Sequence, residues 1–249
     1  MSNLRQKGSP APYLVQLNQV TKTYETSAGN FVALKAIDLS VQVGEFAAVI
    51  GKSGSGKSTL LNIITGIDRV TSGEVFVNGE ALHNLSENQL AIWRGQTVGI
   101  IFQFFQLLPT LTVIENVMLP MDFLGNLSGK QRKTRALELL ALVDMESQAY
   151  KLPNALSGGQ QQRAAIARAL ANDPPVIVAD EPTGNLDSHT SEAILEVFRA
   201  LRREGKTILM VTHEHEVTKW VDRIITLADG EIHTDVQPEG GRHAQPALA

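Results

Sequence analysis

The chain has 249 residues, 43% of them hydrophobic and 19% charged, which is typical of a globular protein large enough to bury a substantial core. Its formal net charge of −4 argues against nucleic acid as the main partner, because nucleic-acid-binding domains usually carry a basic excess. Cysteine is absent from the sequence, which excludes disulfides and thiolate metal sites.

The chain begins with a polar stretch, Met1–Pro10, which lacks the apolar core of a signal peptide. We expect residues 1–12 to be a flexible tail. No apolar run in the sequence approaches the roughly 18 residues that cross a membrane. We therefore expect a cytoplasmic protein without a transmembrane segment of its own, which reaches a membrane only through a partner.

The first predicted element is an antiparallel hairpin. Apolar and polar residues alternate over Tyr13–Val20, the strand ends at Lys22–Tyr24, and alternation resumes over Phe31–Val43 after a turn-like stretch at Glu25–Asn30. Taken alone, Tyr24 is a strand residue that covers the sheet surface, and stacking on a base is the alternative.

A glycine-rich loop lies between the apolar strand Phe46–Ile50 and a helix that is expected to end near Gly66. The loop residues are Gly51, Lys52, Ser53, Gly54, Ser55, Gly56, Lys57 and Ser58, followed by Thr59. Glycines let backbone N–H groups close around phosphate oxygens, and the helix start adds free donors and the positive end of its dipole. Lys57 is expected to reach the β and γ phosphates, and the Ser58 hydroxyl to bind Mg²⁺. A ligand-free flexible loop is the alternative, but the flanking strand and helix favour a nucleotide site.

The next stretch predicts a strand, a short helix and a buried strand. Ser72–Gly79 closes on a tight Asn-Gly turn, and Leu85–Arg94 is expected to be helical with Ser86 as its N-cap. Gln103 follows the buried strand Val98–Phe102. It is either an ordinary surface glutamine or a side chain that points into a ligand crevice at the end of the strand.

The stretch Phe104–Leu124 is too apolar for a solvated loop, and Pro109 and Pro120 make it too broken for a single helix. Most of it is expected to be the core of a subdomain, with Phe104–Leu108 as a candidate contact surface for another protein.

A helix is predicted over Gly129–Val143. Its inward residues are expected to be Leu137, Leu140, Ala141 and Val143, and its basic residues Lys130, Arg132, Lys133 and Arg135 are expected to form a solvated face. Contact of this basic face with anionic lipid is the alternative.

A second glycine motif, Leu156–Gln160, comes before a strong helical pattern over Gln161–Ala171. Ser157 can cap that helix, and Gly158 and Gly159 open its start to an anion by the same physics as the first loop. Two such sites in one chain indicate either two ligands or one ligand shared between two chains.

Two acids end the apolar strand Val176–Glu181. At the carboxyl end of a parallel strand, Asp180 can bind Mg²⁺ and Glu181 can orient an attacking water or accept its proton. The alternative is that these acids only cap the turn at Pro182. His213 follows the next apolar strand, Thr207–Val211, and its place at the same edge favours contact with phosphate over a structural role.

A helix is predicted over Glu192–Arg203, a final hairpin over Arg223–Leu227 and Asp229–Ile232, and a flexible tail over residues 234–249. His213 and His215 flank Glu214 too closely for a helical zinc site, so zinc is not expected.

Together, these motifs resemble the ATP-binding subunit of an ABC transporter over Tyr13–His233, and Leu156–Gln160 matches the signature sequence of that family. The resemblance implies an α/β fold: a P-loop NTPase core with a mostly parallel sheet, an N-terminal antiparallel β subdomain, and a helical subdomain inserted over about residues 104–165. One domain would then span residues 13–233.

The resemblance also implies roles for single residues. Tyr24 would stack on adenine, Gln103 would sense Mg²⁺ and the attacking water, Glu181 would be the catalytic carboxylate, and His213 would contact the γ-phosphate. Asp187 would line a subunit interface. Family members form head-to-tail dimers, so the signature residues Ser157, Gly158, Gly159 and Gln160 would complete the ATP site of the partner copy.

Two stretches, Gln103–Thr112 and Ala179–Asp187, are similar to the macrolide-exporter and lipoprotein-releasing group. That group is thought to drive a separate four-helix permease, and Glu214 and Val70 depart from its pattern, where many members have Asp and Pro. The alternative is a soluble ABC ATPase of nucleic-acid repair or translation, which would carry a long coiled coil or a second cassette. A nucleotide kinase or GTPase would leave Leu156–Gln160 without a role.

Overall fold

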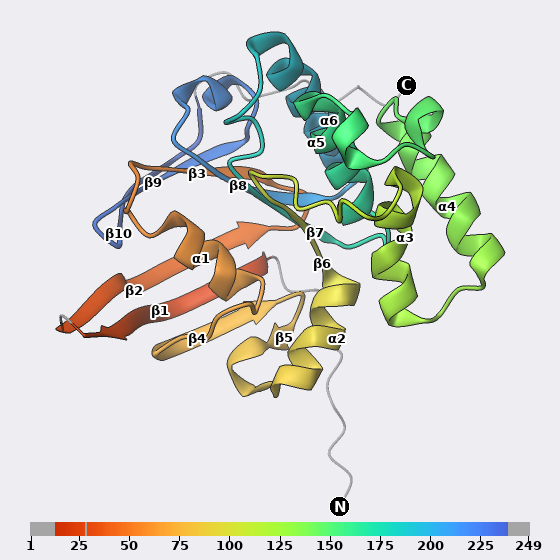
Figure 1. Ribbon diagram of the computed structural model, residues 1–249. Coiled ribbons are helices and arrows are strands. Elements are labelled where there is room, and N and C mark those ends of the chain that lie inside the picture. Colours follow the sequence, from red (N-terminus) through yellow and green to blue (C-terminus); the bar gives the residue numbers. More distant parts are fainter. Residues whose placement is uncertain (1–12, 28, 239–249) are drawn as a thin grey trace, which may run out of the picture.

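The computed structural model describes residues 13–27 and 29–238 (Figure 1). The strands are β1 (Tyr13–Thr26), β2 (Gly29–Gln42), β3 (Phe46–Ile50), β4 (Ser72–Val77), β5 (Glu80–Ala81), β6 (Val98–Ile101), β7 (Val176–Asp180), β8 (Thr207–Thr212), β9 (Arg223–Ala228) and β10 (Glu231–Val236). The helices are α1 (Lys57–Ile64), α2 (Glu87–Thr97), α3 (Val113–Leu124), α4 (Gly129–Leu142), α5 (Gly158–Ala169) and α6 (Ser188–Arg203). Four short 3₁₀ helices in the described residues are η1 (Leu82–Asn84), η2 (Glu146–Gln148), η3 (Pro153–Ala155) and η4 (His215–Lys219).

The central sheet has six strands in the order β10-β9-β3-β8-β7-β6. Its neighbours pair in parallel, except that β10 pairs with β9 in the antiparallel direction. All residues of β3 and β8 are buried, as expected for parallel strands covered on both faces. A second, antiparallel sheet has the order β2-β1-β4-β5 (Figure 1).

The central sheet separates two hydrophobic cores, because successive side chains of a strand point to opposite faces. On one face, Phe46, Ala48 and Ile50 pack with buried residues of α3 to α6. On the other face, Ala47 and Val49 pack with α1 and the antiparallel sheet. Helix α1 therefore lies between the two sheets, with its start held against the end of β3 (Figure 1).

The predicted hairpins and most predicted boundaries are confirmed, with differences that have local causes. Strand β1 continues to Thr26, and β10 continues to Val236, so residues 234–236 belong to a strand rather than to a tail. Helix α5 begins at Gly158 instead of Gln161, because Ser157 and Gln160 form a capping box. The predicted tails at residues 1–12 and 239–249 lie outside the described residues.

Helix α3 corrects the expectation that Pro120 interrupts the apolar stretch. The helix passes through Pro120, and the residues Val113, Val117 and Met121 on its inner face are fully buried. A proline inside a helix costs about 3 kcal/mol, and the burial of three large apolar side chains, at about 1.5–3 kcal/mol each, offsets that cost.

In α4 the buried face is also different from the predicted one. Ala136, Leu139 and Leu140 are buried within the helix, whereas Ala141 is exposed and Leu137 is only half-buried. Leu140 and Val143 point inward as predicted. The helix turns its inner side toward α3 and α5, and this tertiary contact, which a single-helix pattern does not contain, sets the buried stripe.

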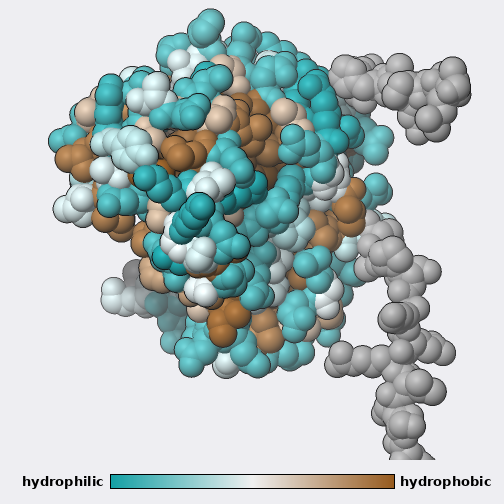
Figure 2. Space-filling model, turned by 90° about the vertical axis from the view of Figure 1, so that its right-hand side faces the viewer, coloured by the Kyte–Doolittle hydropathy of each residue, from teal (hydrophilic) through white to brown (hydrophobic). Residues whose placement is uncertain are grey.

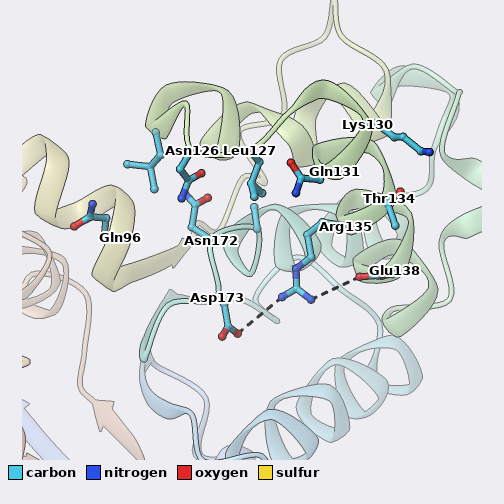
Figure 3. A pocket seen from close by; sticks show the side chains of 12 residues that line it. Gln96, Asn126, Leu127, Lys130, Gln131, Thr134, Arg135, Glu138, Asn172 and Asp173 are labelled. Carbon is cyan, nitrogen blue, oxygen red and sulfur yellow. Dashed lines mark ion pairs between the residues drawn. The ribbon is translucent and has the colours of Figure 1, made fainter.

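A hollow of about 580 Å³ lies beside α4, and Figure 3 shows the side chains that line it. Its arginine pairs with two of its acids, since Arg135 lies 3.8 Å from Asp173 and 4.0 Å from Glu138. Of the four basic residues at the start of α4, Lys130 and Lys133 are exposed as predicted, whereas the two arginines are half-buried in ion pairs. In residues 13–27 and 29–238, none of the helices is long and apolar enough to cross a membrane.

Candidate functional site

The glycines of the first loop are required by the backbone around them. Gly54 and Gly56 have φ angles of +81° and +104°, in the left-handed region that favours glycine. A Cβ atom on Gly51 would lie 2.2 Å from the carbonyl oxygen of Leu227, and one on Gly56 would lie 2.6 Å from that of Ala33. Strand β9 and the β2 strand thus press directly against the loop, and its tight path depends on these glycines.

The loop delivers free donors to the start of α1. Among the helices of the described residues, α2 to α6 each have an N-cap side chain that accepts from the backbone, but the N-cap of α1 is Gly56, which has no such side chain. Lys57 is only 7% exposed, and its ammonium donates to the carbonyl oxygens of Gly51 at 2.8 Å and Lys52 at 3.1 Å. The buried Ser55 Oγ has no partner in the described residues. A buried cation next to uncapped N–H groups suits an anion such as a phosphate.

Four neighbouring parallel strands bring the other polar residues to the same edge as the loop. Strands β3, β8, β7 and β6 lie side by side, and their carboxyl ends lead to the glycine loop, His213, Asp180 and Gln103 respectively. Residues at this edge of a doubly wound sheet share one crevice. The strand order, rather than closeness in sequence, therefore assembles the site.

Asp180 lies against the first turn of α1. Its side chain is hydrogen-bonded to that of Ser58, and Lys57 is close enough to interact with its charge. Burial raises the pKa of Asp180 above its ordinary value, and the Ser58 hydrogen bond and the Lys57 charge oppose this only in part.

A hydroxyl beside a carboxylate is a donor set that Mg²⁺ accepts, with phosphate oxygens and waters as its other ligands. Within the part of the chain that the structure describes, no group of three or more His, Cys, Asp or Glu could hold a metal without such additional ligands. The residues present therefore fit a magnesium ion that arrives with a nucleotide, and do not fit a metal held by protein alone.

Glu181 is held toward His213. Its Oε2 lies 2.5 Å from the His213 Nδ1, and its side chain is 13% exposed whereas that of His213 is 59% exposed. The backbone of Glu181 is left-handed, at φ +48°, which costs about 1–2 kcal/mol for a residue with a Cβ. Its N–H donates to the carbonyl oxygen of Val211 at 2.9 Å, and its own carbonyl accepts from the N–H of Gly184 at 3.2 Å. These bonds fix the carboxylate at the end of β7.

Two residues that the sequence did not single out support this turn. The Thr183 hydroxyl donates to the carboxylate of Glu214 at 2.9 Å, so the glutamate next to His213 holds the turn that follows Glu181. Gly184 lies beside two side chains of the site, since a Cβ there would make ordinary van der Waals contact with Glu181 Oε2 at 3.4 Å and with Gln103 Nε2 at 3.5 Å.

The polar residues at this edge line one open cleft of about 1270 Å³. Of the residues predicted from sequence, it contains Gly51, Lys52, Ser53, Gly54, Ser55, Gly56, Lys57, Ser58, Thr59, Gln103, Asp180, Glu181 and His213. Sequence reasoning missed Phe31 and Thr226–Asp229, which also line the cleft, because nothing in their local pattern distinguishes them from other strand residues. Tyr24 does not line the cleft, but it is hydrogen-bonded to Thr59, which does.

The second glycine motif lies elsewhere on the surface. Ser157, the N-cap of α5, is exposed, and a Cβ on Gly159 would lie 2.5 Å from the Thr190 Cγ2, so α5 packs closely against the start of α6. Asp187 caps α6 by accepting from the Thr190 N–H at 2.9 Å and the Thr190 hydroxyl at 2.6 Å. These bonds lower the pKa of Asp187. The signature residues and Asp187 thus form a second cluster, which the cleft does not include.

A phosphate loop between a parallel strand and a helix, with a serine and an aspartate beside it, defines a phosphate-loop nucleoside triphosphatase.

Comparison with known proteins gives the family. The model of the ABC transporter family matches residues 34–184. The chain is 47% identical over 231 residues to an uncharacterised ABC transporter ATP-binding protein of Methanocaldococcus jannaschii, MJ0796, covering 91% of this chain and 98% of that protein.

Two further relatives are also ABC transporter proteins. The ABC transporter ATP-binding protein YknY of Bacillus subtilis is 47% identical, over 88% of this chain and 95% of its own length. The macrolide export ATP-binding/permease protein MacB of Mannheimia succiniciproducens is 44% identical over 90% of this chain, but only 35% of its own length is matched.

Among solved structures, the dimeric post-hydrolysis state of MJ0796 bound to ADP and phosphate superimposes with a TM-score of 0.85 at 46% identity, covering 91% of this chain and 99% of that one. The chain belongs to the ABC transporter family, as an ATP-binding protein of the ATPase class.

Proposed function

We propose that two copies of this chain bind two molecules of ATP between them, head to tail, and that hydrolysis drives a separate membrane permease of the macrolide-exporter type. The observation that carries this proposal is the division of the site. The cleft holds the loop, Gln103, Asp180, Glu181 and His213, while the exposed Ser157 belongs to a second cluster. A second copy is the simplest source of the missing half. One cassette over residues 13–233, with its helical part over about 104–165, would form each half.

In this proposal the loop residues 51–59 hold the phosphates of ATP. The uncapped N–H groups at the start of α1 and the Lys57 ammonium neutralise the β and γ phosphates. Ser58, Asp180 and Gln103 would hold Mg²⁺, which would supply further positive charge to neutralise the phosphates. Lys57 would leave the carbonyl oxygens of the loop and turn to the phosphates, a change of partner that a flexible four-carbon chain permits.

Hydrolysis requires a water in line with the γ-phosphate. Glu181 is proposed to orient this water and accept its proton, because its half-buried carboxylate stands at the end of β7, next to the metal ligand Asp180. His213, hydrogen-bonded to Glu181, is proposed to contact the γ-phosphate and keep the carboxylate aimed. Most of the rate enhancement then comes from positioning and charge neutralisation.

The partner copy is proposed to supply Ser157, Gly158, Gly159 and Gln160 to the γ-phosphate, with Asp187 at the interface. Support comes from the exposed start of α5 and from the dimers of the M. jannaschii relative, one of which holds ADP and phosphate. ATP would then act as the bond between two copies, and hydrolysis would release it.

The permease is proposed to dock on the side that carries α3 and α4, where Figure 2 shows hydrophobic side chains gathered in patches. A groove of about 520 Å³ runs between α2, β6 and α3, and the exposed Ile92 and Phe123 line it. Phe104, the residue directly after Gln103, is 72% exposed. The MacB relative carries ATP-binding and permease functions in a chain of which only 35% is matched, so a separate permease would supply the rest here.

Such a permease would hold the protein on the cytoplasmic face of the membrane. The test is capture of the tagged full-length chain from detergent-solubilised membranes of its own organism, with a Phe104→Asp, Phe123→Asp variant as a matched control. We expect a multi-helix membrane protein to be recovered with the wild type and lost with the variant. Recovery of ribosomes or DNA instead would overturn the transport proposal.

A further inference from the structure

Tyr24 is part of a polar cluster that the ATPase machinery described above does not use. Its hydroxyl donates to Asp68 Oδ2 at 2.7 Å, and Lys22 donates to Asp68 Oδ1 at 2.6 Å. The Lys22 ammonium also lies 4.7 Å from the centroid of the Tyr24 ring. Lys22 and Tyr24 come from β1, where residues two apart share a face, whereas Asp68 comes from the segment after α1.

We propose that Asp68 and Lys22 are positioning residues that orient the Tyr24 ring as a platform for the nucleotide base. This inference rests on the proposed function and on the stacking of adenine on Tyr24 that the resemblance to the ABC family implies. It assigns a role in base recognition to an aspartate that lies outside the cleft and touches neither phosphate nor metal ligand.

The ring is fixed from two directions. Lys22 covers one face of the ring by a cation–π contact, so the opposite face is the one that a base can reach. The hydroxyl is fixed by Asp68 and by Thr59, the residue that follows the phosphate loop. A base on this platform would therefore lie at a set distance from the first turn of α1, where the phosphates are proposed to bind.

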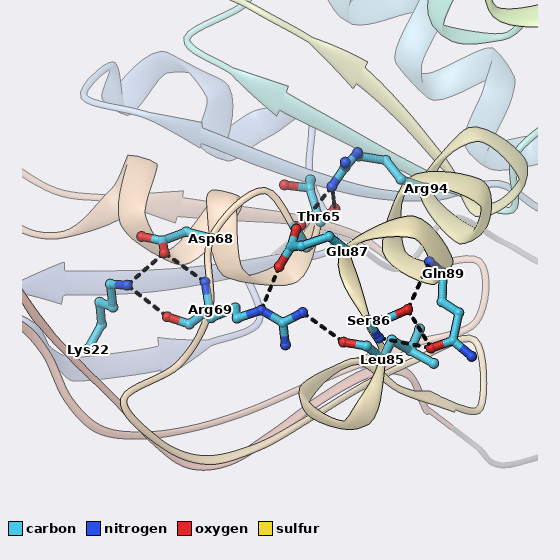
Figure 4. Close-up of polar contacts among 10 residues, drawn as sticks. Lys22, Thr65, Asp68, Arg69, Leu85, Ser86, Glu87, Gln89 and Arg94 are labelled. Carbon is cyan, nitrogen blue, oxygen red and sulfur yellow. Dashed lines mark hydrogen bonds and ion pairs between the residues drawn. The ribbon is translucent and has the colours of Figure 1, made fainter. Parts of the chain in front are cut away.

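Asp68 is itself held rigidly, as Figure 4 shows. Its carboxylate accepts a third hydrogen bond from the Arg69 N–H at 2.7 Å, and its own N–H donates to the carbonyl oxygen of Asn62 in α1 at 3.0 Å. Arg69 continues the cluster to α2, because its guanidinium binds Glu87 at 2.7 Å and the Leu85 carbonyl oxygen at 2.7 Å.

The protonation states agree with this arrangement. Burial alone would raise the pKa of Asp68, but the hydrogen bonds from Lys22, Tyr24 and the Arg69 N–H outweigh it and lower the pKa below its ordinary value. Burial and the neighbouring Asp68 raise the pKa of Tyr24, so the phenol remains a donor. A charged acceptor thus faces a neutral donor, which is the stronger kind of hydrogen bond.

The test compares ATP with inorganic tripolyphosphate, which has the phosphates but no base, on the purified full-length chain. We expect Asp68→Asn to weaken ATP binding about fivefold to tenfold, the effect of misaligning one stacked base, and to leave tripolyphosphate binding unchanged. Tyr24→Phe keeps the ring but removes the hydroxyl, and should show the same selective loss. Glu87→Gln, which breaks only the Arg69–Glu87 pair, is the matched control and should bind both ligands normally.

Asp68 and the Tyr24 hydroxyl act through one contact, so the Tyr24→Phe, Asp68→Asn double variant should be no weaker for ATP than the weaker single variant. Equal losses for ATP and tripolyphosphate would mean that Asp68 only supports the fold, and full additivity would mean that the two residues act independently; either result overturns the inference. If Asp68→Asn does not fold, Tyr24→Phe decides by the same comparison. Unchanged ATP binding in Tyr24→Ala would remove the stacking role itself, and absence of ATP binding by the wild type would refute the proposed function instead.

Discussion

Arg168 of α5 holds the turn that follows Gln103. Its guanidinium donates to the carbonyl oxygen of Phe105 at 2.7 Å and to that of Gln106 at 2.5 Å, and burial lowers its pKa. Phe105 and Gln106 are both left-handed, with φ angles of +57° and +50°. One side chain of the signature helix therefore clamps a strained turn beside the cleft, and Arg168→Met removes the clamp while keeping an unbranched apolar stem.

The loss of stability expected for Arg168→Met is the difference between two opposing contributions. Two hydrogen bonds from a charged donor contribute about 3–6 kcal/mol together, and two left-handed residues with side chains cost about 2–4 kcal/mol. When Arg168 is replaced, the turn can relax and release its strain, so only the difference is lost. We expect the free energy of unfolding of Arg168→Met to fall by about 1–2 kcal/mol.

Denaturant unfolding of the purified chain measures this loss, and ATP turnover reports on Gln103, which lies two residues before the turn. Turnover should fall in Arg168→Met because the relaxed turn no longer fixes Gln103. Arg163→Met is the control, since Arg163 lies on the same helix but contacts the Val143 carbonyl oxygen and Asp144. It should lose some stability and keep its turnover. A loss of about 5 kcal/mol would mean that the turn stays strained after the clamp is gone, and no loss would mean that the clamp contributes nothing; either would refute the reasoning.

Two further predictions concern the loop and the Asp68 cluster. Gly56→Ala should destabilise the protein by at least about 2 kcal/mol and abolish ATP binding, because the Gly56 backbone is left-handed and a Cβ there would clash with the Ala33 carbonyl oxygen. Gly54→Ala is the control, since a Cβ at Gly54 meets nothing within 4 Å, and it should lose less stability in a denaturant titration. Equal losses of stability in the two variants would contradict the clash. Asp68→Asn should lower stability at pH 7 by about 1 kcal/mol. Because the folded-state pKa of Asp68 is lowered, this penalty should be complete above the unfolded pKa of about 4 and shrink as the pH falls below it. A pH series of unfolding curves in which the penalty grew toward acid would contradict that sign.

Features that are determined by one continuous stretch of the chain could be predicted from the sequence. The glycine loop, the apolar strands and the polar residues that end them were predicted, because strand order and phosphate-loop geometry place such residues at one edge. The capping boxes at Ser86 and Ser157 also follow from residues three apart, and both serines were predicted as caps.

Contacts between distant segments were beyond the sequence. Three hydrogen bonds join residues that lie far apart in the sequence, and no local sequence pattern predicts them: Tyr24 to Asp68, Thr183 to Glu214, and Arg168 to Phe105. The same holds for the continuation of α3 through Pro120, where burial against neighbouring helices outweighs a local penalty. The roles assigned to Tyr24 and Asp187 came from resemblance to a family, and they stay predictions, as do the roles of the other site residues.

In the proposed mechanism, two copies of the chain bind ATP between them, and Glu181 is required for ATP hydrolysis. The most direct measurement is gel filtration with light scattering of the full-length Glu181→Gln variant at saturating ATP and Mg²⁺, with turnover measured on the same sample. The account predicts that the variant binds ATP, loses most of its turnover and accumulates as an ATP-bound dimer, and that Ser157→Arg added to it restores the monomer. Turnover close to that of the wild type, or a monomer at saturating ATP, would contradict it.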